Sequence, residues 1–136
     1  EINTKMPEYV VEKVVDALNR RSKAVRGADV LMLGVSYQKN IGDLRESPCL
    51  DMLSLLLRKG ARVSYHDPYV PRLAVDGHRL KSVPLAQARL KRADCVVIGT
   101  DHDAFDWAFV VRWARLIMDT RNATKSVARN HKVVKL

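Results

Sequence analysis

The sequence ADVLMLGVSYQKNIGDLRESP (residues 28–48) decides the fold of this chain. It begins with a continuous apolar run, residues 28–36, which is typical of a strand buried on both faces of a parallel sheet. The run opens into a polar loop that carries Lys39, Asp43 and Arg45. Because a plain connection needs only about four to six residues, the extra length predicts that this loop contacts a ligand.

A helix is expected directly after the loop. Ser47 and Pro48 are residue types that suit the N-cap and the first helical position. Leucines then repeat at helical spacing, and Gly60 is suited to end the helix. The stretch 28–60 therefore predicts one strand, one long loop and one helix of a βαβ unit.

The rest of the chain continues this alternation, which predicts a mostly parallel sheet with right-handed crossovers. The expected fold class is α/β, a Rossmann-like three-layer sandwich. In chain order, the expected elements are helix 7–21, the unit just described, strand 61–68, a loop 69–82 with a short strand near its end, helix 84–93, strand 94–100, helix 101–114, strand 115–123, and a tail 131–136 that is either a last strand or loose.

Composition and charge limit the possible functions. The 136 residues are 47% hydrophobic and 29% charged, which excludes disorder, and no apolar run approaches the roughly 18 residues that span a bilayer. The net charge of +9 is compatible with an anionic partner, but a solvated basic surface is the alternative, because the basic residues are spread along the chain. Aromatic residues make up only 6% of the chain, too few to alternate with the basic residues and stack on nucleic-acid bases.

The chain has no signal-peptide pattern and no initiator Met, and it reads as if it were cut from a longer protein. Cys49 and Cys95 lie in apolar contexts, which fits a reducing cytoplasm. Cys49 is expected in the first turn of a helix, where a lowered thiol pKa makes a nucleophile, or else as a buried structural residue. Cys95 is expected in the core.

The loop after the first strand is the main candidate site. Ligands of open α/β sheets bind beyond the carboxyl ends of the strands, and the loop leads to a helix N-terminus, which favours anions. Arg45 could bind a phosphate with two hydrogen bonds. Arg121 follows a strand at the same edge, as a ligand contact or as a surface ion pair. However, the loop has one glycine where the dinucleotide motif G-x-G-x-x-G needs three glycines at fixed spacing.

Two further patterns have structural alternatives. Asp101, His102 and Asp103 resemble a fragment of a metal site, but no second cluster at ligand spacing accompanies them, and helix capping accounts for the acids. His66 and Asp67 could be a base and its orienting acid. Adjacent strand residues point to opposite faces, so an Asp-Pro turn is the alternative for Asp67. No metal site is predicted.

Several motifs together resemble the C-terminal part of the UDP-glucose/GDP-mannose dehydrogenase family. The stretch MPEYVV (residues 6–11), at the start of the expected first helix, is most similar to the branch of UDP-N-acetylglucosamine and UDP-N-acetylmannosamine 6-dehydrogenases. The resemblance extends from Asn3 to about Asn122. Its motifs, in chain order, are NTKMPEYVVEKVVDALN, the block GxxYxxNxxDxRESP beginning at Gly34, GARVSYHDPYVP, DCVVIGTDHDAF and IMDTRN.

The resemblance implies an NAD-dependent enzyme that oxidises the C6 hydroxyl of a UDP-sugar twice, to a uronic acid. It implies that residues 1–22 end a central helical dimerisation region and that residues 23–136 form the UDP-sugar-binding domain. Such a chain lacks the catalytic cysteine and the N-terminal domain that binds most of the NAD, and it catalyses nothing alone. The whole protein is then expected to be a cytoplasmic homodimer or larger homo-oligomer, with no nucleic-acid or membrane partner.

The resemblance also assigns site residues by position. Tyr37, Gln38 and Arg121 match positions that contact the nucleotide-sugar, and Arg45 matches an arginine that reaches NAD. Gln38 departs from the family, which usually has Lys there, so a cation near the substrate is lost. This departure motivates one alternative, a degenerate domain kept for assembly. The charge motivates another, a basic nucleic-acid-binding α/β module.

Overall fold

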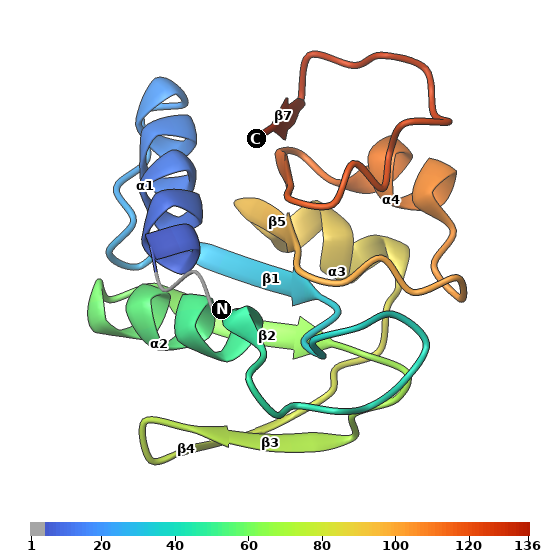
Figure 1. The fold of residues 1–136 in the computed structure, drawn as a ribbon. Helices are drawn as coiled ribbons and strands as arrows, with labels where there is room; N and C mark the ends of the chain where they lie inside the picture. Colours follow the sequence, from blue (N-terminus) through green and yellow to red (C-terminus); the bar gives the residue numbers. More distant parts are fainter. Residues whose placement is uncertain (1–4) are drawn as a thin grey trace.

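The computed structural model describes residues 5–136, in which a parallel sheet lies between two layers of helices (Figure 1). Residues 1–4, the beginning of the predicted helical region, lie outside the described residues. The elements are α1 (Lys5–Arg20), β1 (Asp29–Leu33), α2 (Pro48–Arg58), β2 (Arg62–His66), β3 (Arg72–Val75), β4 (His78–Lys81), α3 (Gln87–Arg92), β5 (Cys95–Ile98), α4 (Trp107–Trp113), β6 (Ile117–Asp119) and β7 (Val133–Lys135).

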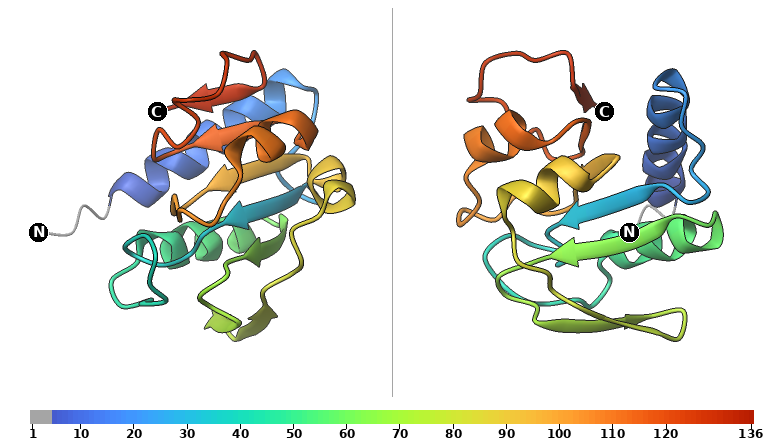
Figure 2. Two further views of the ribbon diagram at one scale, coloured as in Figure 1. Left: turned by 90° about the vertical axis from the view of Figure 1, so that its right-hand side faces the viewer. Right: turned by 180° about the vertical axis from the view of Figure 1, so that it is seen from behind.

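The main sheet has five strands in the order β2-β1-β5-β6-β7, and every neighbouring pair is parallel. The left view of Figure 2 shows these strands pointing the same way. The predicted α/β sandwich with a mostly parallel sheet is therefore confirmed. The tail, whose state the sequence left open, forms β7 beside β6.

The central strand β1 is buried along its whole length because helices cover both faces of the sheet. Successive side chains of a strand point to opposite faces. Val30 and Met32 accordingly join the core under α1 and α2, whereas Leu31 and Leu33 join the core under α3 and α4. A continuous apolar run is thus required here, as the sequence indicated.

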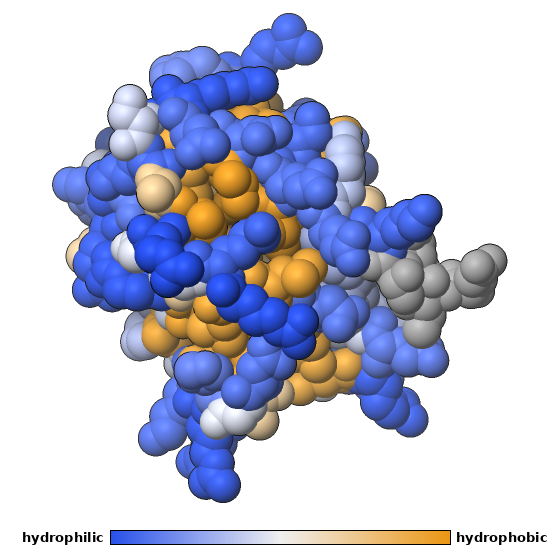
Figure 3. Space-filling view, turned by 90° about the vertical axis from the view of Figure 1, so that its left-hand side faces the viewer, coloured by the Kyte–Doolittle hydropathy of each residue, from blue (hydrophilic) through white to orange (hydrophobic). Residues whose placement is uncertain are grey.

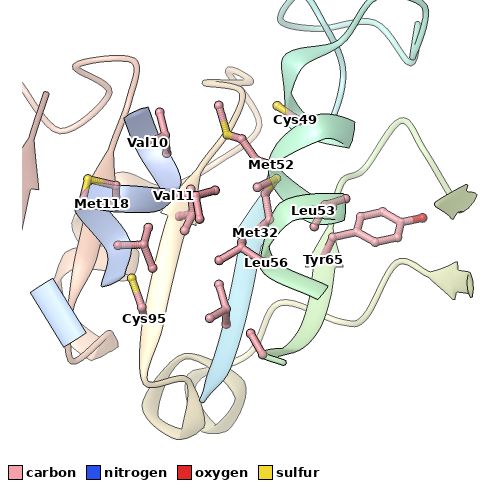
Figure 4. Close-up of a cluster of buried hydrophobic side chains, with 14 of the residues drawn as sticks. Val10, Val11, Met32, Cys49, Met52, Leu53, Leu56, Tyr65, Cys95 and Met118 are labelled. Atoms are coloured by element: carbon pink, nitrogen blue, oxygen red, sulfur yellow. The ribbon is translucent and has the colours of Figure 1, made fainter. Parts of the chain in front are cut away.

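Helices α1 and α2 form the layer over the first face (Figure 4). The valine side chains on one face of α1 are covered by the core, because Val10, Val11 and Val14 are at most 1% exposed. Between the hydrophilic residues of this face, some hydrophobic surface still reaches solvent (Figure 3). The α2 start is as predicted, since the Ser47 side chain accepts a hydrogen bond from the Cys49 N–H and Pro48 is the first helical residue.

The second layer differs from the sequence prediction in length. The expected helix 101–114 was too long, because α4 begins at Trp107, after the N-cap Asp106. Phe105 has helical spacing to later aromatic residues, yet it is buried in a turn before the helix. The expected helix 84–93 is also shorter, since α3 spans only Gln87–Arg92.

The region 69–82 forms a separate antiparallel hairpin of β3 and β4 below β2 (Figure 1); β4 is the short strand expected near the end of this region, whereas β3 was not predicted. Asp76 and Gly77 make its turn with φ angles of 50° and 79°. Two positive φ values are required in the tight turns that match the twist of paired strands, and Asp-Gly supplies them. Within residues 5–136, no helix is both long and apolar enough to cross a membrane.

Candidate functional site

The strand order places a switch point at the carboxyl ends of β1 and β5. From β1 the chain moves to β2 on one side and later returns to β5 on the other. The chain therefore continues from these two strands to opposite sides of the strand order, and the carboxyl end of the sheet at such a point is where open α/β sheets bind ligands. The long loop after β1, the turn after β5 and the loop after β6 all meet here.

The loops after β1 and β5 are in close contact through two glycines. Gly34 has φ 79°, and a Cβ built on it would lie 2.4 Å from the Thr100 carbonyl oxygen. A Cβ on Gly99 would lie 2.4 Å from the Gly34 carbonyl oxygen. The Thr100 hydroxyl also donates to the Ser36 carbonyl oxygen at 2.7 Å. Only glycine allows the two backbones to approach this closely.

A buried histidine joins three loops. His102 Nε2 lies 2.9 Å from Asp67 Oδ2, and the Asn40 N–H donates to His102 Nδ1 at 2.7 Å. Since a backbone N–H only donates, Nδ1 carries no proton, and the Nε2–H donates to Asp67. Asp67 Oδ2 also accepts from the Val35 N–H at 2.9 Å. The ring is therefore neutral and its tautomer is fixed.

Ser36, His102 and Asp67 together have the composition of a hydrolase triad but not its connections. Ser36 Oγ is 3.4 Å from His102 Nε2, the same nitrogen that faces Asp67. A triad needs the acid and the nucleophile on different ring nitrogens. All three residues are at most 2% exposed. The cluster is thus a structural support for the loops and not a nucleophile.

The structure brings together the three predicted substrate residues. Tyr37 and Gln38 lie in the exposed part of the loop after β1. The Arg121 Nη2 donates to the Tyr37 carbonyl oxygen at 3.0 Å, and its Nε donates to the Gly99 carbonyl oxygen at 3.1 Å. Its Nη1 lies 3.9 Å from Asp101. The guanidinium is therefore held between the loops after β1 and β5, with its side chain 30% exposed.

Asp119, the last residue of β6, fixes the loop that carries Arg121. Its carboxylate accepts from the N–H groups of Arg121 and Ala123, and from the N–H and hydroxyl of Thr124, at 2.7–3.1 Å. Burial raises the pKa of Asp119, but the hydrogen bonds from Thr124, Ala123 and Arg121 outweigh it and hold the pKa below its ordinary value. Sequence reasoning missed this acid.

Arg45 lies at the same edge but is not joined to Arg121 by any contact in the described structure. Its Nε and Nη2 donate to the two carboxylate oxygens of Asp43 at 3.0 and 2.9 Å, while its side chain is 88% exposed. The hydrogen bonds from Arg45 hold the pKa of Asp43 below its ordinary value. Arg45 therefore points its remaining donors to solvent.

Neither cysteine has the setting of a nucleophile. Cys49 and Cys95 are both fully buried. Burial raises the pKa of the Cys49 thiol, and it raises the pKa of the Cys95 thiol to about 12. The structural alternative is therefore correct for both. Within residues 5–136, no group of three or more His, Cys, Asp or Glu could hold a metal ion.

The remaining candidates are structural supports that the sequence located only in part. His66 and Asp67 do point apart, since His66 Nδ1 contacts the Val83 carbonyl oxygen and Asp67 contacts Val35 and His102. His102 was considered only as part of a metal motif. Asp67 and His102 are 35 residues apart in the chain, so only the sheet order reveals that they meet.

Comparison with known proteins identifies the family of this site. A sequence model of the UDP-glucose/GDP-mannose dehydrogenase family, UDP binding domain, matches residues 31–126. The chain belongs to this family. The matched region contains the whole of the loop after β1, the buried His102 cluster and Arg121. The predicted resemblance is thus confirmed.

Several curated proteins are similar to the chain. A UDP-N-acetyl-D-mannosamine dehydrogenase of Methanococcus maripaludis is 34% identical over 77% of this chain and 23% of that protein. An NDP-N-acetyl-D-galactosaminuronic acid dehydrogenase of Ralstonia nicotianae is 33% identical over 89% of this chain and 28% of that protein. The chain therefore spans about a quarter of the length of these relatives.

Solved structures agree on the fold. A UDP-D-ManNAc dehydrogenase from Pyrococcus horikoshii matches with a TM-score of 0.79 at 23% identity, over 98% of this chain and 31% of that chain. An NDP-N-acetyl-D-galactosaminuronic acid dehydrogenase from Methanosarcina mazei matches with a TM-score of 0.77 at 26% identity, over 98% and 29%. In both cases nearly all of this chain superposes on one part of a longer protein.

Proposed function

We propose that this chain binds the UDP part of a UDP-sugar outside the carboxyl ends of β1, β5 and β6. The observation that carries the proposal is the position of Arg121. It is anchored by Asp119 and held beside Tyr37, within the region that matches the family's UDP binding domain. The names of the similar proteins support a UDP-sugar carrying an acetamido group as the substrate class.

The chemistry of the site suits a diphosphate and a sugar. An arginine has five N–H donors, and two of those on Arg121 are used by the carbonyl oxygens of Gly99 and Tyr37. Donors on its outer edge stay available for phosphate or sugar oxygens. Gln38 is exposed and can both donate to and accept from a sugar. The α2 N-terminus is less available than expected, because Ser47 caps the Cys49 N–H.

The proposed whole protein is an NAD-dependent UDP-sugar 6-dehydrogenase that oxidises the C6 hydroxyl to a uronic acid in two steps. NAD would supply the hydride acceptor in this chemistry. The residues of this chain fit only a contact at the rim of NAD, because the loop after β1 lacks the glycine motif and offers an exposed cation, Arg45, instead. This chain then positions the nucleotide-sugar, and the remaining domains of a homo-oligomer carry out catalysis in the cytoplasm.

The test is isothermal titration of the chain with UDP. We expect Arg121→Ala to weaken binding at least about tenfold, as for loss of a charge-assisted hydrogen bond. Arg45→Ala is the matched control, an exposed arginine of the same edge, and should leave the affinity for UDP unchanged. Gln38→Lys should strengthen binding, because it restores a cation beside the diphosphate.

A folded chain that releases no heat with UDP would contradict the proposal for the isolated domain. The longer protein would then be assayed for NAD reduction with UDP-N-acetyl sugars. Activity there would assign the binding to a site completed by other domains. Inactivity would favour the assembly alternative that Gln38 suggests.

A further inference from the structure

The loop after β1 carries Tyr37 and Gln38 but has little apolar burial of its own. Residues 37–42 are all exposed, and Asn40 has a φ of 68°, which L residues other than Asn and Asp rarely adopt. Within the loop, the Tyr37 N–H donates to the Asp43 carbonyl oxygen at 3.0 Å, and the Ser36 hydroxyl donates to the Gln38 carbonyl oxygen at 2.7 Å. Neither bond reaches Asn40, so contacts from outside the loop must hold that part of it.

Besides the bond from Arg121 to Tyr37, His102 supplies two of these contacts, one inside the exposed segment at Asn40 and one, through Asp67, just before it at Val35. It accepts from the Asn40 N–H directly, and its Nε2–H holds Asp67, whose same oxygen receives the Val35 N–H. The ring is 0% exposed, and it packs edge-on against Tyr69 with 4.8 Å between ring centroids. A buried, fully connected polar cluster of this kind tends to specify one arrangement.

A second, weaker contact reinforces the first. Asn40 Nδ2 donates to Asp103 Oδ2, and the Asp103 N–H donates to Asn40 Oδ1, both at 2.9 Å. The Asp103 side chain is 74% exposed, so water competes for these bonds. Of the two contacts to Asn40, the one from the buried imidazole is therefore the stronger.

We propose that His102 is a positioning residue of the UDP site: its neutral Nε2–H tautomer holds the loop after β1 in the conformation that binds UDP. The predicted effect of His102 on UDP affinity rests on the proposed function, whereas its predicted effect on the loop conformation does not. His102 itself is buried and does not touch the ligand.

Two substitutions separate the two bonds of His102. In His102→Asn, the amide oxygen can occupy the place of Nδ1 and accept from Asn40. In His102→Gln, the amide nitrogen can occupy the place of Nε2 and donate to Asp67, but no acceptor faces Asn40. His66→Gln is the matched control, because His66 contacts Val83 and Phe105 and not the loop.

We expect His102→Gln to weaken UDP binding about tenfold, the factor for one lost hydrogen bond to a buried group, and His102→Asn to weaken it less than about threefold. Hydrogen exchange of the Asn40 amide should be fast in His102→Gln and protected in His102→Asn and His66→Gln. Loss of stability alone does not predict this split between the two His102 variants.

The outcomes distinguish the inference from the proposed function. Equal UDP affinity in wild type and His102→Gln, with Asn40 released, would overturn the inference alone. If wild type does not bind UDP, the proposed function fails, and protection of Asn40 in His102→Gln would still overturn the loop's dependence on His102. Should the variants fail to fold, the ¹⁵N spectrum of the wild-type ring decides, because a protonated Nδ1 contradicts the proposal.

Discussion

The parallel strands begin at one side of the sheet, here called the amino edge, and end at the opposite side, the carboxyl edge. These two edges are built from different interactions. Eight buried residues in the described part of the chain are polar or charged, and seven of them lie at the carboxyl edge. Only Asp29 lies at the amino edge, where Arg89 pairs with it at 2.8 Å. The seven are Ser36, Ser47, Asp67, Thr100, His102, Asp119 and Thr124.

The amino edge is held mainly by exposed cations at helix ends. Arg115 donates to the carbonyl oxygens of Lys91 and Arg92 at the end of α3, at 2.7 and 2.9 Å. Lys132 donates to the Ala114 carbonyl oxygen after α4 at 2.9 Å. Cations are favoured at helix C-termini, but exposed ones contribute little. From this comparison we expect the sheet to tolerate substitutions at the amino edge better than at the carboxyl edge.

The largest expected effect is at Gly34. Gly34→Ala should lower the free energy of unfolding by at least about 3 kcal/mol, because a positive φ is combined with a backbone clash. Gly77→Ala is the matched control: it has the same φ of 79°, but nothing lies within 4 Å of its added Cβ. It should cost about 1 kcal/mol. Urea denaturation measures both, and equal costs would show that the close approach of the two loops is unimportant.

Asp119→Asn is expected to come next, with a loss of about 2–3 kcal/mol at pH 7, because an amide NH₂ must face donors that the carboxylate accepted. The folded-state pKa of Asp119 is lowered, so its contribution is present above the unfolded pKa of about 3.9 and disappears as pH falls further. The difference between wild type and variant should therefore shrink below about pH 4. A difference independent of pH would contradict this account. Asp51→Asn, on exposed α2 surface, is the control.

The smallest expected effect is at the amino edge. Arg115→Ala should cost about 1 kcal/mol or less, because water replaces the lost bonds at the end of α3. The affinity for UDP should not change. Thermal unfolding and UDP titration check the two parts of this prediction. A loss of UDP binding would break the contrast between the edges, whereas Arg129→Ala in the exposed tail should leave both quantities unchanged.

Much of the fold could be predicted because its signals are local. The apolar run of β1 and the cap at Ser47 are decided by residues close in sequence. The first strand of the hairpin, β3, was missed although Asp76 and Gly77 are a strong turn signal, because the two strands are short and mostly exposed. Helix 101–114 was overextended because the burial of His102 fixes a turn that periodicity does not reveal.

The site was predictable only where a residue is itself exposed and chemically distinctive. Arg121 stood out because it follows a strand, whereas Tyr37 was assigned only through the resemblance to the family, and both assignments stay predictions. The supports did not, because Asp119, Asp67 and His102 become meaningful only through partners. For Asp67 and His102 the distance between partners in sequence hides them, since Asn40 and His102 are 62 residues apart. The partners of Asp119 lie within five residues of it, but they are mostly backbone N–H groups that leave no sequence signal.

The parallel order of the sheet also has a kinetic consequence during synthesis. β1 can pair with β2 early, but its other neighbour, β5, is made much later, and Thr100 reaches back 64 residues to Ser36. Arg121 reaches back 84 residues to Tyr37. The proposed UDP site is therefore among the last features that a growing chain can complete. Until then the loop after β1 lacks the contacts from Thr100, His102 and Arg121, and the partly assembled sheet has an unpaired edge strand that is prone to non-native pairing.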